Sequence, residues 1–202
     1  MRTTQRDLLV STAERLFAEQ GIDAVSLRTV MAEAGTNVAA VNYHFGSKDS
    51  LVEAVVRARS EEIRESRDAL LSALEDAESP TVRHLAEAFV LPLARMAVAG
   101  DTQWIRLVAG VTGSGHPSIA VIDEEFNGQT TRLGALLRRV RPDLDQVALR
   151  FRLTVAMTTA YRTLGDLEDL RARVTPPGKP TVTDERLVTE VVDAVAAILG
   201  QA

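Results

Sequence analysis

Residues 26–51 read SLRTVMAEAGTNVAAVNYHFGSKDSL, and this stretch decides the fold. Ser26 and Ser47 are suited to cap helices, because a serine hydroxyl can accept a hydrogen bond from an unpaired backbone N–H. Gly35 suits the left-handed end of the first helix, and Gly46 ends a second helix. Two short helices around a tight turn, followed by a third helix start, predict a helix-turn-helix that reads DNA.

The second helix of this stretch carries few bulky residues on its outer sides. Val38, Val41 and Phe45 share one face and can pack inward, which leaves small and polar residues elsewhere. Alanine can touch thymine methyl groups in the major groove, and asparagine can pair with base edges. The residues predicted to contact DNA are Arg28, Asn37, Ala39, Ala40, Asn42, Tyr43, His44 and Lys48. The spacing alone also fits a plain helix corner with polar boundary residues.

A family resemblance adds to this interpretation. Residues 6–55 resemble the N-terminal domain of the tetracycline-repressor (TetR) family of bacterial regulators. The resemblance rests on three blocks: LFAEQGIDAVSLRTVMAEAG at 16–35, AAVNYHFGSK at 39–48 and SKDSL at 47–51. It implies a transcriptional regulator and implicates the same eight positions at the DNA. The family often has a tyrosine where this chain has Asn42, so a phosphate contact is either replaced by a base contact or lost.

Composition excludes several other classes of protein. The chain has 202 residues, 46% of them hydrophobic, which is ample for a core. It has no cysteine, so disulfides and thiolate metal sites are excluded. The three histidines show no metal spacing and no phosphate-binding glycine loop occurs, so we expect neither an enzyme nor a cofactor or metal. Without a leading or membrane-length apolar run, we expect a soluble cytoplasmic protein with no membrane contact.

The net charge of −5 at first argues against nucleic acid as a partner. Within residues 1–60 the basic and acidic side chains balance, so this part of the chain is not a basic domain. A DNA-binding face must then come from the placement of a few cations and helix ends. Because phosphate attraction supplies most non-specific affinity, we expect weak non-specific binding and dependence on two half-sites.

The remaining sequence predicts helices only. No alternating strand pattern is present, and the fold class is all-α with about nine helices. Helices are expected over residues 4–20, 47–74, 144–170 and 184–200, and another is expected to begin with Ser79 as cap and Pro80 as first residue. The charged middle of the second of these helices, residues 60–68, is expected to be a solvated face. We divide the chain into a three-helix DNA-binding domain, 1–47, and a helical bundle, 48–202, for effector binding and dimerisation.

Bulky residues are scattered over the middle helices of the predicted bundle. Each one alone is most simply core, but as a group they can line an apolar cavity, and helical bundles often bind ligands between their helices. The predicted effector-pocket residues are Phe89, Met96, Trp104, Arg106, Phe126, Met157 and Tyr161.

The last helices of the chain carry apolar residues on more than one side. A surface helix needs a single apolar stripe, so a wider one suggests contact with a second chain as well. The predicted dimer-interface residues are Phe151, Val155, Val188, Val191, Val192, Val195 and Leu199. A monomer with a buried C-terminal helix would show the same pattern. A two-fold dimer would hold two recognition helices about one DNA turn apart, roughly 34–36 Å.

Together these patterns predict a ligand-responsive regulator that binds a double-stranded DNA operator as a homodimer. Repression of a palindromic operator, relieved by a small and largely apolar effector, is the favoured mechanism. The alternatives are a helical carrier of a hydrophobic ligand without DNA binding and an all-α enzyme with an unrecognised site. DNA binding and the oligomeric state discriminate between the first two.

Overall fold

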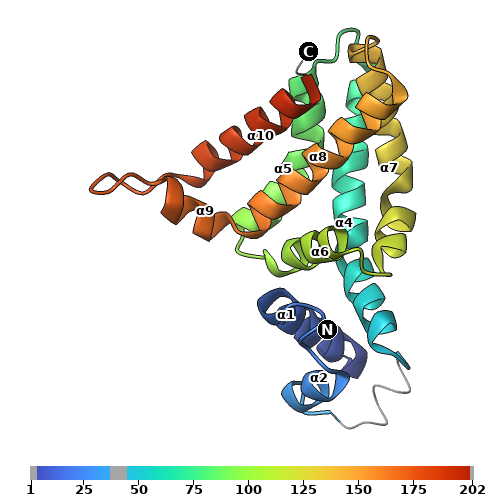
Figure 1. The fold of residues 1–202 in the computed structure, drawn as a ribbon, viewed down its shortest axis with the longest axis vertical. Coiled ribbons are helices and arrows are strands. Elements are labelled where there is room, and N and C mark those ends of the chain that lie inside the picture. The colour runs from blue at the N-terminus through green and yellow to red at the C-terminus, as the bar shows by residue number, and fades with distance from the viewer. Residues whose placement is uncertain (1–3, 37–44, 201–202) are drawn as a thin grey trace.

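The computed structural model describes residues 4–36 and 45–200, and in this part of the chain all regular structure is helical. Figure 1 shows a tall bundle standing on a smaller N-terminal unit. The predicted all-α fold with about nine helices is confirmed for the described residues. Their helices are α1 (Gln5–Gln20), α2 (Leu27–Glu33), α4 (Lys48–Asp76), α5 (Val82–Val98), α6 (Gln103–Ser114), α7 (Ile119–Val140), α8 (Gln146–Gly165), α9 (Leu167–Val174) and α10 (Asp184–Gly200).

Local sequence signals set most of the helix ends. The hydroxyl of Ser26 accepts from the backbone N–H of Thr29 at 3.1 Å, and Ser47 caps α4 in the same way. Gly35 follows α2 with a φ of +63°, where a side chain would be strained. These three predictions are confirmed. The prediction that α5 begins at Pro80 is wrong, because Thr81 caps α5 instead.

The N-terminal unit, which comprises α1, α2 and the first turns of α4, shares one apolar core with the bundle. Leu9, Ala13 and Leu16 on one stripe of α1 are all but inaccessible to solvent. They form one apolar cluster with residues of α2 and α4, such as Val30 and Leu51. The start of α4 is therefore packed against α1 and α2.

The helix α4 joins this unit to the bundle as one continuous rod of 29 residues. It packs against α1 at its start and against α5 and α7 further along, as Figure 1 shows. Arg132 of α7 holds the far part of α4 by ion pairs with Asp68 and Glu75, each at 2.7 Å. The helix α10 covers α5 and α8 on the opposite side.

The helix α6 lies across the base of the bundle and also packs against α1 and α8. Its Trp104 is completely buried, and the indole nitrogen donates a hydrogen bond to the Val56 carbonyl of α4 at 2.9 Å. A buried indole N–H needs such a partner, so this bond fixes α6 on α4. The helix α6 thereby connects the bundle with the N-terminal unit.

The single helix predicted over 144–170 is interrupted at Asp166, where α8 gives way to α9. The carbonyl of Gly165 accepts a hydrogen bond from Nε of Arg106 at 2.7 Å. A Cβ on Gly165 would lie 3.2–3.4 Å from atoms of Arg106, so α6 approaches the end of α8 very closely. This tertiary contact, which the sequence pattern does not reveal, accompanies the break.

Candidate DNA-binding surface and ligand cavities

Two predicted DNA contacts, Arg28 and Lys48, lie within the described residues. Arg28 is exposed on α2 and forms no hydrogen bond or ion pair within residues 4–36 and 45–200. Lys48 is the first residue of α4, and its ammonium donates to the Asp23 carbonyl at 3.4 Å. Both cations are therefore outside ion pairs in the described structure, as phosphate contacts require.

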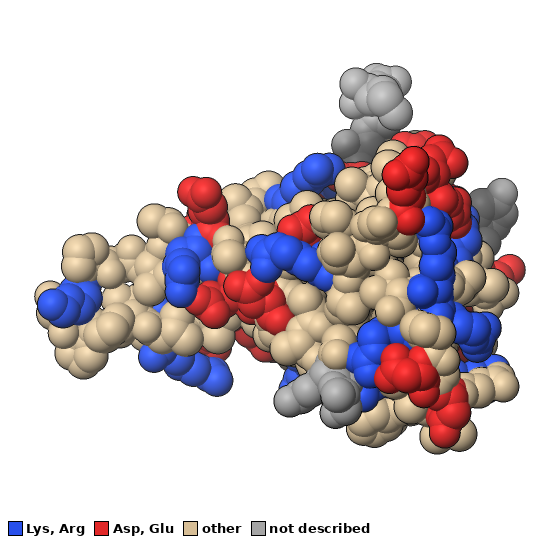
Figure 2. Space-filling model, turned by 90° about the horizontal axis from the view of Figure 1, so that it is seen from above, with Lys and Arg blue, Asp and Glu red and all other residues tan. Residues whose placement is uncertain are grey.

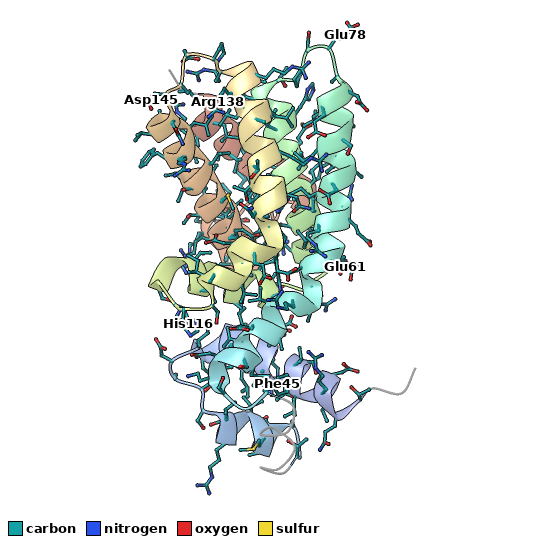
Figure 3. All side chains as sticks on the ribbon, turned by 90° about the vertical axis from the view of Figure 1, so that its right-hand side faces the viewer. Phe45, Glu61, Glu78, His116, Arg138 and Asp145 are labelled. Carbon is teal, nitrogen blue, oxygen red and sulfur yellow. The ribbon has the colours of Figure 1, made fainter. Side chains whose placement is uncertain are left out.

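The other six predicted contacts, Asn37, Ala39, Ala40, Asn42, Tyr43 and His44, lie outside the described residues. Their immediate neighbours show how the segment is framed. Phe45 is partly buried against the apolar cluster, and the Arg6 guanidinium lies 5.6 Å from its ring centre. Figure 3 shows Phe45 inside the N-terminal unit. Phe45 thus packs on the N-terminal unit immediately before α4 begins.

Ion pairs within the N-terminal unit neutralise another of its cations. Arg15 of α1 pairs with Glu19 at 3.3 Å and with Glu33 of α2 at 3.0 Å. At the opposite end of the molecule, acidic and basic side chains are interspersed on the face in Figure 2. That face shows no broad area of positive charge that could attract a phosphate backbone.

One acidic side chain is buried where the N-terminal unit meets the bundle. Glu14 of α1 is only 6% exposed, and burial raises the pKa of its carboxyl group. The charge of Arg59 opposes this shift, while Asp101 adds to it. Arg59 and Asp101 form an ion pair at 2.7 Å. The junction is therefore sensitive to the ionisation of one carboxyl group.

A cavity of about 470 Å³ lies at the same junction. Its walls come from the end of α1 and the loop after it, and from α6 and the end of α8. Arg106 and Tyr161 of the predicted effector pocket both line it. Figure 3 shows His116, another lining residue, at the level where the bundle meets the N-terminal unit. A ligand here would touch both parts of the molecule.

Four predicted pocket residues come together in the bundle as one aromatic cluster. The ring centres of Phe89 and Tyr161 are 6.0 Å apart, those of Trp104 and Phe126 6.3 Å, and those of Trp104 and Tyr161 6.4 Å. All four are at most 3% exposed. Edge-on aromatic contacts at these distances are favourable, so the cluster acts as core.

A second cavity, of about 220 Å³, opens beside this aromatic cluster between α7 and α8. Phe126, Met157 and Tyr161 form its apolar walls, and Asp123, Asn127 and Thr130 add polar groups. Met96, another predicted pocket residue, lines a separate cavity of about 290 Å³ together with Pro92. Tyr161 lines both the junction cavity and this smaller one.

The prediction that residues 60–68 form a solvated face is wrong at three positions, one of which is Ile63 with 1% exposure. Ser60 is fully buried, and Arg67 is only 3% exposed. The guanidinium of Arg67 lies 4.4 Å from the ring centre of Phe89 and 5.5 Å from that of Phe126. Burial lowers its pKa, while the neighbouring Tyr161 opposes the shift. The sequence held a signal for this, since positions 56, 60, 63, 67 and 71 form one helical stripe.

The predicted dimer residues divide into two groups. The side chains of α10 at Val191, Val192, Val195 and Leu199 are at most 3% exposed within the chain's own core. Val188 and Val155 are partly exposed, and Phe151 of α8 is 68% exposed. One turn before it, Val147 is 77% exposed, although the sequence analysis did not select it. The accessible apolar surface is therefore centred on α8.

An apolar groove of about 400 Å³ lies further along α8. It is lined from α8, α9 and α10, with Leu170, Val174 and Val191 among the lining residues. In residues 4–36 and 45–200, no helix has the length and apolar character needed to cross a membrane.

Two family models match the chain, one for each part of the fold. The model of bacterial regulatory proteins of the tetR family matches residues 9–55. The model of the tetracyclin repressor-like C-terminal domain matches residues 87–197, which is more than half of the chain.

Individual relatives agree with these matches. The regulator BetI of Rhizobium meliloti is 31% identical over 83 residues, which are 41% of this chain and 39% of BetI. The chain thus spans about two-fifths of the length of that curated relative. A Shewanella protein described as a tetR family transcription regulator has the same fold, with a TM-score of 0.67 at 16% identity over 97% of this chain and 96% of that one. The regulator FadR of Bacillus halodurans gives a TM-score of 0.64 at 16% identity, over 100% and 97% of the two chains.

With a helix-turn-helix sequence at its N-terminal end and a helical bundle behind it, this chain belongs to the tetR family of bacterial DNA-binding transcriptional regulators.

Proposed function

We propose that this regulator is a repressor that binds a palindromic operator as a homodimer and leaves it when a small, largely apolar effector binds. Residues 1–47 bind DNA in this proposal, and residues 48–202 bind the effector and form the dimer. The DNA contacts are the eight residues predicted above, of which Arg28 and Lys48 remain without an ion pair in the described structure.

The placement of α6 is the observation that carries the proposal. This helix packs against α1 of the N-terminal unit, while its Trp104 belongs to the aromatic cluster of the bundle. A ligand that displaces the cluster must therefore displace α6, and with it α1. Because equilibrium linkage is reciprocal, an effector that weakens operator binding is itself bound more weakly by the operator complex.

The apolar surface on α8 supports the dimer. Val147 and Phe151 are exposed on α8, and a separate apolar groove is lined from α8, α9 and α10. Two copies that bury this surface around a two-fold axis would pair identical patches. Such a dimer offers two DNA-binding units to the two halves of a palindrome, about 34–36 Å apart.

A gel-shift experiment with DNA from upstream of the chain's own coding sequence tests the proposal. We expect a shifted complex with the natural chain and a weakened one with Lys48→Ala or Asn42→Ala. Lys179→Ala is the matched control, because Lys179 lies in the loop between α9 and α10 and is the only other lysine. Full binding by both Lys48→Ala and Asn42→Ala would refute the assigned DNA contacts. No shift with any upstream fragment would favour the carrier of a hydrophobic ligand.

A further inference from the structure

Arg67 is a buried cation without an anionic partner among the described residues. It is 3% exposed, and its Nε has no hydrogen-bond partner. One Nη reaches the Phe89 carbonyl at 3.5 Å, which is a long hydrogen bond. Moving a charge out of water costs several kcal/mol unless other groups compensate it, so such an arginine calls for an explanation.

Other arginines of the bundle have the partner that Arg67 lacks. Arg59 pairs with Asp101, and Arg57 pairs with Glu124 at 2.7 Å. Asp68, the acidic residue next to Arg67 in sequence, pairs instead with Arg132 at 2.7 Å. The acidic groups near α4 are thus committed to more exposed arginines. The aromatic rings of Phe89 and Phe126 compensate Arg67 only in part, because a cation–π contact leaves its N–H groups unpaired.

The smaller cavity lies directly beside this guanidinium. Phe126 and Tyr161 line that cavity, and the guanidinium of Arg67 lies 5.5 Å from the ring centre of Phe126. The phenol of Tyr161 opposes the lowering of the Arg67 pKa by burial, and because a guanidinium can only donate, the phenol oxygen is the atom that can accept from Arg67. The phenolic proton then remains free to be donated to an acceptor in the cavity. Tyr161 therefore connects the buried positive charge with the space that a ligand would fill.

Resting on the proposed effector-controlled function, we propose that Arg67 and Tyr161 form the anion-binding end of the effector pocket, and that the effector is a compact aromatic monocarboxylate. Its carboxylate accepts a hydrogen bond from Tyr161 and takes the place of the missing counter-charge. Its apolar body lies against Phe126 and Met157, because aromatic rings and methionine sulfur pack favourably on an aromatic ligand.

The dimensions and charges of the site narrow the ligand further. A volume of about 220 Å³ is small beside the roughly 300–1,000 Å³ of common ligand pockets, which favours a single-ring compound. Arg67 offers one positive charge, which matches one carboxylate. Asp123 also lines the cavity and disfavours a second negative group by repulsion. A dianionic or phosphorylated compound therefore fits less well than a monoacid.

Matched pairs of probes test this inference with the full chain in the absence of DNA. Benzoate, phenylacetate and 3-phenylpropionate are compared with benzamide, phenylacetamide and 3-phenylpropionamide by thermal shift and isothermal titration calorimetry. The members of each pair have nearly the same shape but differ in charge. We expect at least one carboxylate to raise the melting temperature and to bind tenfold or more tightly than its amide.

Three variants locate the effect. Arg67→Met should abolish the preference for the carboxylate, and Tyr161→Phe should weaken carboxylate binding about tenfold, since both remove a donor from the proposed site. Tyr161→Phe alters a single hydroxyl, so it remains informative even if Arg67→Met does not fold. Arg150→Met is the control, because Arg150 is exposed on α8 and should leave binding unchanged.

Two outcomes overturn the inference. One is that no carboxylate of the panel binds more tightly than its amide; the other is that the preference survives in Tyr161→Phe and in every folded Arg67 variant. The proposed regulatory function is judged separately by the gel shift. Carboxylate binding through Arg67 without DNA binding would refute that function and support this site, whereas DNA binding without any carboxylate preference would do the reverse.

Discussion

The junction around Glu14 and the bundle centre around Arg67 each bury one ionisable side chain, and they do so under different constraints. Glu14 is 6% exposed and can lose its charge, since burial raises its pKa and protonation neutralises it. Arg67 is 3% exposed, and arginine remains charged in proteins despite the direction of its shift. The charge of Glu14 can therefore change with pH, whereas the charge of Arg67 persists and can be compensated only by an anion. On the proposal made above, this difference would make the bundle centre the place where the charge of a ligand is selected.

Trp104→Ala should have the largest effect, because it removes the aromatic packing of the bundle centre and leaves the surroundings of Arg67 open. Trp104 is fully buried, and its indole bond to Val56 is lost as well. A loss of about 3–5 kcal/mol of unfolding free energy is expected in urea denaturation. Trp104→Phe, which keeps most of the packing, should cost clearly less. Equal costs for both variants would mean that the indole bond, not the packing, holds α6.

Arg67→Met should make the free chain more stable by about 1–4 kcal/mol, since apolar replacements of buried charges are often stabilising. Urea denaturation without added ligand measures this change. A loss of stability would show that the rings of Phe89 and Phe126 already compensate the charge. The contrast with Glu14 would then disappear, because neither region would need an external partner.

Glu14→Gln should stabilise the chain by about 1 kcal/mol at pH 7.5, which corresponds to a rise in melting temperature of about 2–4 °C. The folded state has the raised pKa, so ionisation of Glu14 costs stability above that pKa and costs nothing below the ordinary value of 4.5. The gain should therefore vanish near pH 4. Glu19→Gln is the control, because Glu19 is exposed on the same helix and should change stability by less than about 0.5 kcal/mol at either pH.

Lys48→Ala should have the smallest effect on folding and a specific effect on DNA. Each lost phosphate contact lowers the slope of log affinity against log salt by about 1, uniformly over DNA sequences. Fluorescence anisotropy between 50 and 200 mM salt measures this slope for Lys48→Ala and for the control Lys179→Ala. An unchanged slope in Lys48→Ala would remove the N-terminal end of α4 from the DNA interface.

The sequence was most informative for features that depend on residues adjacent in the chain. The caps at Ser26 and Ser47 and the turn at Gly35 follow from local chemistry, and the structure agrees. The long helix predicted over 47–74 is also present as α4.

Tertiary packing decided the features that the sequence analysis missed. The sequence predicts a solvated position for Arg67 because the residue is charged. Its helical spacing from buried residues of α4 indicates the opposite, and the structure agrees with the spacing. Val192 and Val195 were assigned to the dimer, but α5 and α8 cover α10 within the chain. Periodicity shows that a face is buried, and it does not show which neighbour buries it.

The central claim is that two copies of the N-terminal unit bind DNA together, under control of the bundle. Hydroxyl-radical footprinting tests it most directly, on an upstream fragment that the chain shifts in gels. We expect two protected patches with their centres about one helical turn apart, roughly 34–36 Å. A single patch, or protection that is the same for the natural chain and for Lys48→Ala, would contradict it.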